Sequence, residues 1–136
     1  RELSEKMLRE RLKQRGYDEA AVDDAVGRIK ADRALNDERF AGALARLEIS
    51  TKRHGRLRAQ RQIEAAGIPS GMARAALDEA LAAVDQDALL ESALSRRLRG
   101  DATIEDEAHF RRLYRFLLGQ GFDSDRALKA LKRRQQ

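Results

Sequence analysis

The candidate functional residues of this sequence are clustered arginines and lysines, and their side chains can bind anions. Six basic side chains fall between residues 46 and 61, where Glu48 is the only acid. A run with so little opposing charge can meet carboxylates or phosphates. We therefore predict a partner-binding segment made of Arg46, Lys52, Arg53, Arg56, Arg58 and Arg61.

Three smaller basic clusters follow this run. They are Arg96, Arg97 and Arg99; Arg111, Arg112 and Arg115; and Lys129, Lys132, Arg133 and Arg134. The first two extend the candidate surface for a protein partner or DNA. The alternative is a set of solvated helix faces with pairs such as Glu107 and Arg111 four residues apart. The last cluster is also explained by a frayed basic tail.

Catalytic motifs are missing from the sequence. It has no cysteine, no glycine-lysine phosphate loop and no GxGxxG. His54 and His109 are far apart and are interpreted as surface or cap histidines. No apolar run approaches the ~20 residues of a membrane span. We expect no enzyme activity, no catalytic residue, no cofactor, no metal and no membrane contact.

The amino-acid composition indicates which secondary structure carries these charged residues. In 136 residues, 42% are hydrophobic, 4% aromatic and 38% charged, against ~25% charged in a typical chain. One proline and abundant alanine, leucine, arginine and glutamate favour helix almost throughout. The length suits about one domain. A helical chain with a thin core and an anionic partner is the expectation.

One unit occurs three times, over residues 8–18, 59–69 and 113–123. Each version ends in a glycine followed by an apolar residue: Gly16-Tyr17, Gly67-Ile68 and Gly121-Phe122. Glycine suits the left-handed position just after a helix, and the next residue then contacts the helix's last turn. The unit therefore predicts three helix ends.

The residues after these glycines, and two further sites, predict helix starts. Asp18, Ser70 and Asp123 are expected N-caps, as is Asn36, whose helix would be stapled by Leu35 and Phe40. Thr103 with Asp106 is expected to form a capping box. The resulting helices cover 3–15, 18–32, 36–50, 56–66, 70–84, 86–99, 103–119 and 123–134. We group them as repeats over 1–50, 51–100 and 101–136, the last being a helix pair, in one functional unit.

Four segments resemble, in the right order, the motifs of the RecX family of regulators of the RecA recombinase. They are Arg1-Glu2-x-Ser4 with Leu8; Leu35-Asn36-Asp37-Glu38-Arg39-Phe40-Ala41; Gly55 with Ile63 and Gly67-Ile68; and Arg112-x-x-Arg115-Phe116-Leu117-Leu118 with Gly121-Phe122. Leu3 and Gln62-Ile63 depart from the family pattern. The chain opens at the first motif, so a further N-terminal segment is expected.

The resemblance implies an all-α fold of tandem three-helix repeats in an elongated, curved array. It further implies a cytoplasmic, monomeric, non-enzymatic protein. Such a protein binds the groove of the RecA–DNA filament and inhibits strand exchange, ATP hydrolysis and coprotease activity. Modules that touch successive subunits would gain effective concentration from their linkage.

Two other classes of protein remain open. A direct DNA-binding protein of the helix-turn-helix kind has similar three-helix units, but needs a helix that starts with base-reading side chains. A helical adaptor without nucleic-acid contact would bind with weak salt dependence. The sequence does not decide whether its basic clusters meet the recombinase or single- or double-stranded DNA.

Overall fold

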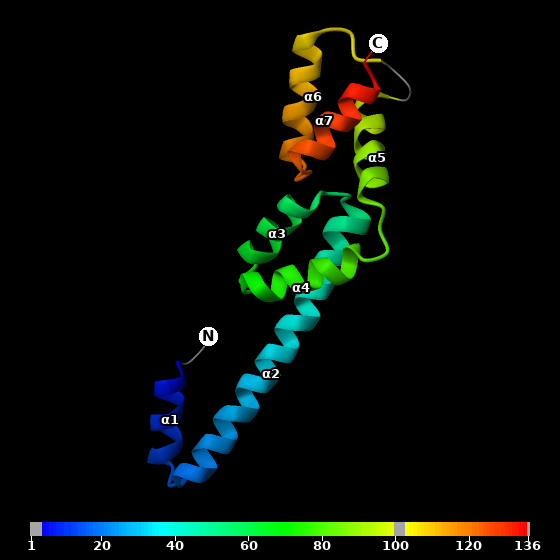
Figure 1. Ribbon diagram of the computed structural model, residues 1–136. Helices are drawn as coiled ribbons and strands as arrows, with labels where there is room; N and C mark the ends of the chain where they lie inside the picture. The colour runs from blue at the N-terminus through cyan, green and yellow to red at the C-terminus, as the bar shows by residue number, and fades with distance from the viewer. Residues whose placement is uncertain (1–3, 100–102, 136) are drawn as a thin grey trace. The chain divides into compact units, whose positions relative to one another are not determined.

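The computed structural model describes residues 4–99 and 103–135 (Figure 1). Over these residues the chain has seven α-helices, one π-helical turn and no strand, which confirms the all-α prediction. The elements are α1 (Glu5–Gln14), α2 (Glu19–Arg46), the π-helical turn (Leu47–Thr51), α3 (Arg56–Ala65), α4 (Ser70–Leu81), α5 (Gln86–Leu98), α6 (Glu107–Gly119) and α7 (Ser124–Arg133). The chain divides into two compact units, residues 1–39 and 40–136, and the boundary falls within α2.

The first unit is a helix pair. Ser4 caps α1, because its hydroxyl accepts the backbone N–H of Met7 at 3.2 Å. Arg9 of α1 pairs with Asp23 of α2 at 2.5 Å, and Lys30 pairs with Glu5. These charge pairs hold the two helices side by side.

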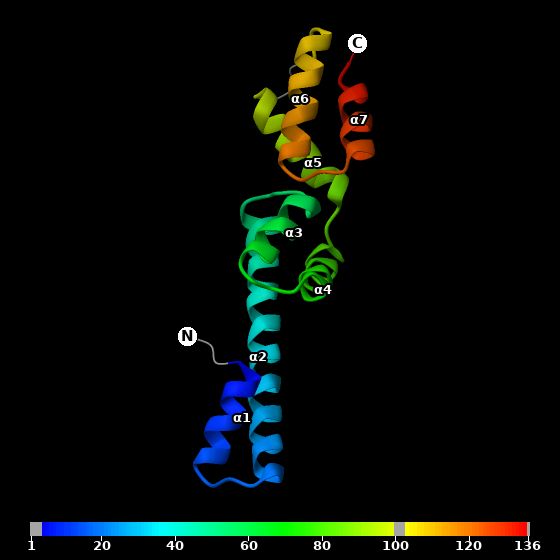
Figure 2. The same cartoon turned by 90° about the vertical axis from the view of Figure 1, so that its left-hand side faces the viewer.

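The second unit has two hydrophobic cores. The first core lies among the end of α2, the π-helical turn, α3 and α4, and includes Ala45, Ile63 and Leu77. The second lies among α5, α6 and α7, which form one group (Figure 2), and includes Leu94 and Leu117. Helix α5 was expected to close the second repeat. Its buried side chains instead share a core with α6 and α7.

The three glycine turns are confirmed. Gly16, Gly67 and Gly121 have φ of 96°, 96° and 98°, in the left-handed region. Each following residue donates its N–H back into the helix: Tyr17 to the carbonyl of Leu12 at 3.2 Å, Ile68 to Ile63 at 3.4 Å, and Phe122 to Leu117 at 3.1 Å. This is the Schellman pattern, which satisfies carbonyls that a helix end leaves without partners.

The predicted break before residue 36 is wrong. Helix α2 continues through Leu35 and Asn36 to Arg46. No glycine or proline stands between Arg28 and Ala41, and asparagine or aspartate inside a helix costs only about 0.7 kcal/mol each. An N-cap preference is too weak to end a helix on its own. Leu35 and Phe40 therefore form no staple, and each is nearly half exposed.

The remaining helix starts are partly confirmed. Asp18 accepts the N–H of Ala21 at 2.8 Å, and Asp123 accepts that of Arg126 at 3.1 Å, so both are caps. Ser70 is not a cap, because Pro69 takes that position without a side-chain hydrogen bond. The predicted capping box at Thr103 is also wrong. Asp106 is the N-cap of α6, and because its own backbone is extended the helix cannot begin before it. The gap between the helices expected over 86–99 and 103–119 lies outside the described residues.

Candidate partner-binding surface

The N-terminus of α3 is capped by the turn that ends α6. The N–H of Gly55 donates to the carbonyl of Gln120 at 2.8 Å, and the N–H of Leu57 donates to that of Gly121 at 3.0 Å. No side chain caps α3. The positive end of one helix thus meets the negative end of the other, which stabilises both. This contact joins the two cores of the second unit.

Arg58 lies at the end of a row of arginines on α6. Its guanidinium donates to the carbonyl of Gly119 at 3.3 Å. Gly119 is four residues beyond Arg115, which is four beyond Arg111, so all three share one face of α6. Arg112 lies on the same exposed side, within an arc of about 100°. Arg61 follows Arg58 by about one turn of α3.

We call this set the α3–α6 basic surface: Arg58, Arg61, Arg111, Arg112 and Arg115. Arg61 and the three arginines of α6 are exposed. Among the described residues, none of these four forms an ion pair or a side-chain hydrogen bond, and the Glu107–Arg111 pair of the alternative interpretation does not form. Two clusters that are 50 or more residues apart in sequence therefore flank one contact between α3 and α6, and their charge is uncompensated.

Three other residues of the 46–61 run are bound to groups within the protein. Lys52 pairs with Glu48 at 3.2 Å. The backbone φ of Arg53 is 57°, which is unusual for a residue other than glycine. Its side chain donates to the hydroxyl of Ser92 at 3.2 Å. Arg56 pairs with Asp78 at 2.6 Å. Arg53 and Arg56 thus reach partners on α5 and α4, which are distant in the sequence and could not be read from spacing along the chain, whereas Lys52 reaches a residue only four positions before it.

The other predicted binding residues lie elsewhere on the unit. Arg46 lines a cleft of about 320 Å³ between the end of α2 and α4. Arg97 stacks on the ring of Phe116, with its guanidinium 4.9 Å from the ring centre, a cation–π contact between α5 and α6. Arg96 and Arg99 are exposed at the end of α5.

A buried carboxylate was missed by the sequence analysis. Glu48 is only 2% exposed and lies on the π-helical turn. Nδ1 of the half-buried His54 contacts its Oε1 at 2.8 Å. A buried charge needs such partners, so Glu48 fixes the loop that leads into α3. His54 is thus a structural residue, and the irregular turn that buries Glu48 has no sequence signal.

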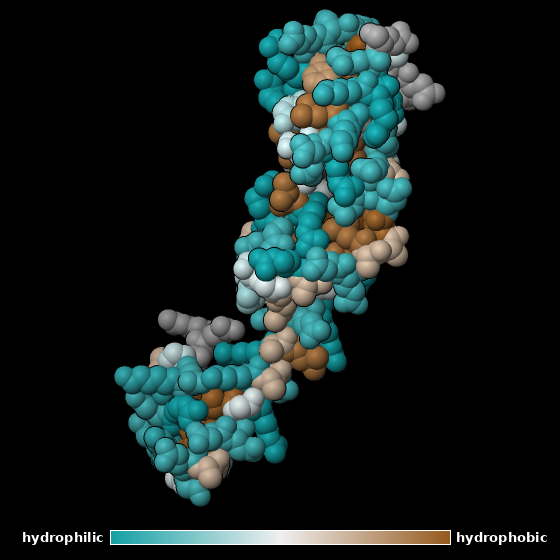
Figure 3. Space-filling model, viewed as in Figure 1, coloured by the Kyte–Doolittle hydropathy of each residue, from teal (hydrophilic) through white to brown (hydrophobic). Residues whose placement is uncertain are grey.

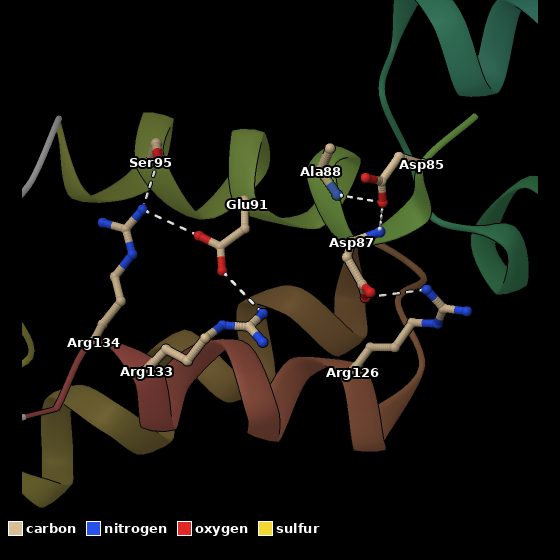
Figure 4. A network of polar contacts seen from close by, with 8 residues as sticks. All are labelled: Asp85, Asp87, Ala88, Glu91, Ser95, Arg126, Arg133 and Arg134. Atoms are coloured by element: carbon tan, nitrogen blue, oxygen red, sulfur yellow. Dashed lines mark hydrogen bonds and ion pairs between the residues drawn. The ribbon is translucent and has the colours of Figure 1, made fainter. Parts of the chain in front are cut away.

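The basic C-terminal cluster is not a frayed tail. Arg133 and Arg134 both reach Glu91 of α5 at 3.3 Å, and Arg134 also donates to the hydroxyl of Ser95 at 2.7 Å (Figure 4). Near the other end of the same helix, Asp87 pairs with Arg126 at 3.1 Å. These contacts clamp α7 on α5.

The segment Asp37-Glu38-Arg39-Phe40 lies within α2. Glu38, Arg39 and Phe40 are exposed and Asp37 is half-buried. Over residues 4–99 and 103–135, no group of three or more histidine, aspartate or glutamate side chains could hold a metal ion. In the same residues no helix has both the length and the apolar character needed to cross a membrane.

The helices of the described residues define the class, which is an all-α protein. Comparison with known proteins narrows this class. A family model described as the first three-helix domain of RecX matches residues 1–28. "Regulatory protein RecX" of Syntrophotalea carbinolica is 31% identical over 125 residues, covering 91% of this chain and 82% of that protein. "Regulatory protein RecX" of Chlorobaculum tepidum is 28% identical, covering 92% and 75%.

The chain belongs to the RecX family. This membership agrees with the resemblance found in the sequence motifs. It also agrees with the expectation of a regulatory protein rather than an enzyme, because the relatives carry that name.

Proposed function

We propose that this protein binds the RecA–DNA filament and lowers its recombinase, ATPase and coprotease activity. The observation that carries the proposal is the α3–α6 basic surface, where a helix-to-helix cap brings two clusters of arginines without acidic partners together. Membership of the RecX family supports the identity of the partner.

The charge of this surface fits the groove of a filament. A RecA filament on DNA offers phosphates and carboxylates, and arginine forks bind both groups in a bidentate manner. Each exposed ion pair contributes about 0.2–1 kcal/mol and weakens with salt, so several pairs are needed for useful affinity. The proposal places the protein in the cytoplasm as a monomer that spans several contacts.

Direct reading of DNA by α3 is the alternative. Helix α3 begins with Arg56, Arg58, Gln60 and Arg61, residue types that read base edges. However, Arg56 is bound to Asp78, and the amide of Gln60 donates to Glu64 at 2.8 Å and to the carbonyl of Ser70 at 3.1 Å. Arg58 also donates to the carbonyl of Gly119, so three of these four side chains are already hydrogen-bonded, which favours the filament.

The proposal is tested with purified RecA on single-stranded DNA. Filaments are pelleted with increasing amounts of this protein, and ATP hydrolysis is followed in parallel over a salt series. We expect co-sedimentation and a dose-dependent fall in hydrolysis, both weaker at high salt. A protein that binds bare DNA and leaves RecA activity unchanged would contradict the proposal and favour the alternative.

A further inference from the structure

Leu57 is an apolar side chain placed among the arginines of α3. It is 53% exposed, the largest such value among the long aliphatic side chains that the structure describes. Arg61 follows it by one turn on the same side of α3, and Arg56 and Arg58 flank it in sequence. Charged residues thus lie beside this leucine on α3. Figure 3 shows one face of the molecule, which is mostly hydrophilic with several hydrophobic patches.

A hollow of about 200 Å³ opens beside Leu57. Leu57, Gly121 and Phe122 supply its apolar wall, where the start of α3 meets the α6–α7 turn. The hollow is smaller than the ~300–1,000 Å³ of sites that enclose small molecules. Its size and lining suit one large apolar side chain.

Arg56 and Arg126 at the rim of the hollow are paired with aspartates, whereas Arg58 and Arg61, which lie near Leu57 on α3, have no acidic partner among the described residues. Asp123 is the only acid that lines the hollow and already caps α7. The carboxylate partners of Arg56 and Arg126, Asp78 and Asp87, are 64% and 61% exposed, so both ion pairs are weak. Because a guanidinium has five N–H donors, each arginine can also bind a second carboxylate.

We propose that Leu57 and this hollow bind an apolar side chain carried by an acidic segment of a protein partner. The inference rests on the proposed function, because the partner in question is the protein part of the filament. An apolar anchor inside a polar rim is the anatomy of a protein–protein contact, and a few such anchors dominate its binding energy.

Nucleic acid fits the hollow less well. Surfaces that bind phosphate backbones are polar and strongly basic, and need no apolar socket. Single-stranded bases stack on exposed aromatic rings, whereas Phe122 is 4% exposed and Leu57 is aliphatic. Arg58 and Arg61 beside Leu57 have no acidic partner among the described residues, so their charge complements carboxylates next to an apolar residue.

The test compares Leu57→Ala with wild type on two ligands: RecA filaments on single-stranded DNA, and the same DNA without RecA. Alanine is a good helix former and the site is exposed, so folding is retained. We expect about a tenfold loss of filament affinity at low and high salt, with any affinity for bare DNA unchanged. Leu57→Met, which keeps an apolar side chain of similar size, should restore most of the binding.

The matched control is Leu47→Ala, because Leu47 is 40% exposed and does not line the hollow. It should bind like wild type. Filament binding by Leu57→Ala equal to wild type would overturn the inference alone, as would an equal loss on bare DNA, which would point to nucleic acid. Wild-type protein that fails to bind filaments would overturn the proposed function as well.

Discussion

Gly55 and Gly121 approach so closely that neither position has room for a side chain. A Cβ on Gly55 would lie 2.5 Å from the carbonyl carbon and oxygen of Gly121, and one on Gly121 would lie 2.4 Å from the backbone nitrogen of Arg58. This backbone contact lets the carbonyls of the turn after α6 cap α3. It also brings the two halves of the α3–α6 basic surface together.

Glycine substitutions should separate the cost of this contact from the cost of a left-handed turn. Gly121→Ala meets both a positive φ and a backbone clash, whereas Gly67→Ala meets only the positive φ in open space. We expect Gly67→Ala to cost about 1–2 kcal/mol of unfolding free energy, and Gly121→Ala to cost more. Thermal and urea unfolding measure both.

Gly71→Ala is the matched control. Gly71 lies in the first turn of α4, has an ordinary φ and has nothing within 4 Å of an added Cβ. This variant should match or slightly exceed the wild-type stability. Equal stability of Gly121→Ala and Gly67→Ala would show that the Gly55–Gly121 contact has no energetic role.

The local parts of the fold could be predicted from the sequence. The glycine turns at Gly16, Gly67 and Gly121 follow from residues within one helical turn of each other. The break expected at Asn36 is wrong because a local cap preference, worth about 1 kcal/mol, does not end a helix that the flanking residues continue.

The candidate site could be predicted only in part. The basic clusters with few nearby acids are visible in the sequence. In the structure, Arg61 and Arg115 of these clusters are exposed and have no acidic partner among the described residues. The sequence does not reveal contacts between residues far apart in the chain. Arg53 and Arg56 are therefore among the predicted partner-binding residues, although Ser92 and Asp78 bind their side chains. Such contacts depend on how helices pack, which no spacing along the chain encodes.

Removal of the buried carboxylate should destabilise the second unit. Glu48→Ala deprives His54 of its partner at 2.8 Å and Lys52 of its partner at 3.2 Å. We expect a loss of about 1–3 kcal/mol in urea unfolding, the usual cost of leaving a buried polar group unsatisfied. Glu48→Gln retains a carbonyl acceptor for His54 and should lose less than half as much. Equal losses would mean that the contact with His54 is irrelevant.

The clamp between α5 and α7 should depend on salt. Glu91→Gln weakens its contacts with both Arg133 and Arg134 at 3.3 Å. Because these groups are partly exposed, we expect a loss of about 0.5–1 kcal/mol at low salt that shrinks at high salt. Glu79→Gln, an exposed site with no ion pair among the described residues, should change stability by less than about 0.5 kcal/mol. A salt-independent loss at Glu91 would indicate a packing effect.

The helix pair of the first unit should respond to acid. The hydrogen bond and charge of Lys30 lower the pKa of Glu5 below its ordinary value of 4.5, with a smaller contribution from Arg9. A lowered folded-state pKa means that the contribution of Glu5 to stability is present above the unfolded pKa and is lost as pH falls through the folded value. NMR titration should show the pKa of Glu5 rising towards 4.5 in Lys30→Gln. An unchanged pKa would contradict the Glu5–Lys30 contact.

Filament co-sedimentation of a charge-reversed variant tests most directly whether the α3–α6 basic surface binds the filament. The variant carries Arg61→Glu, Arg111→Glu and Arg115→Glu, three exposed side chains without partners among the described residues. The control carries Lys6→Glu, Arg33→Glu and Lys129→Glu, which changes net charge equally at exposed sites outside this surface.

Circular dichroism and thermal unfolding should show both variants folded, because helix propensity differs little between arginine or lysine and glutamate. At low salt the surface variant should bind filaments more than about tenfold more weakly than wild type, and the control should retain most of the affinity. The difference should narrow as salt is raised. A folded surface variant that pellets with wild-type affinity at low salt would contradict the proposed binding surface.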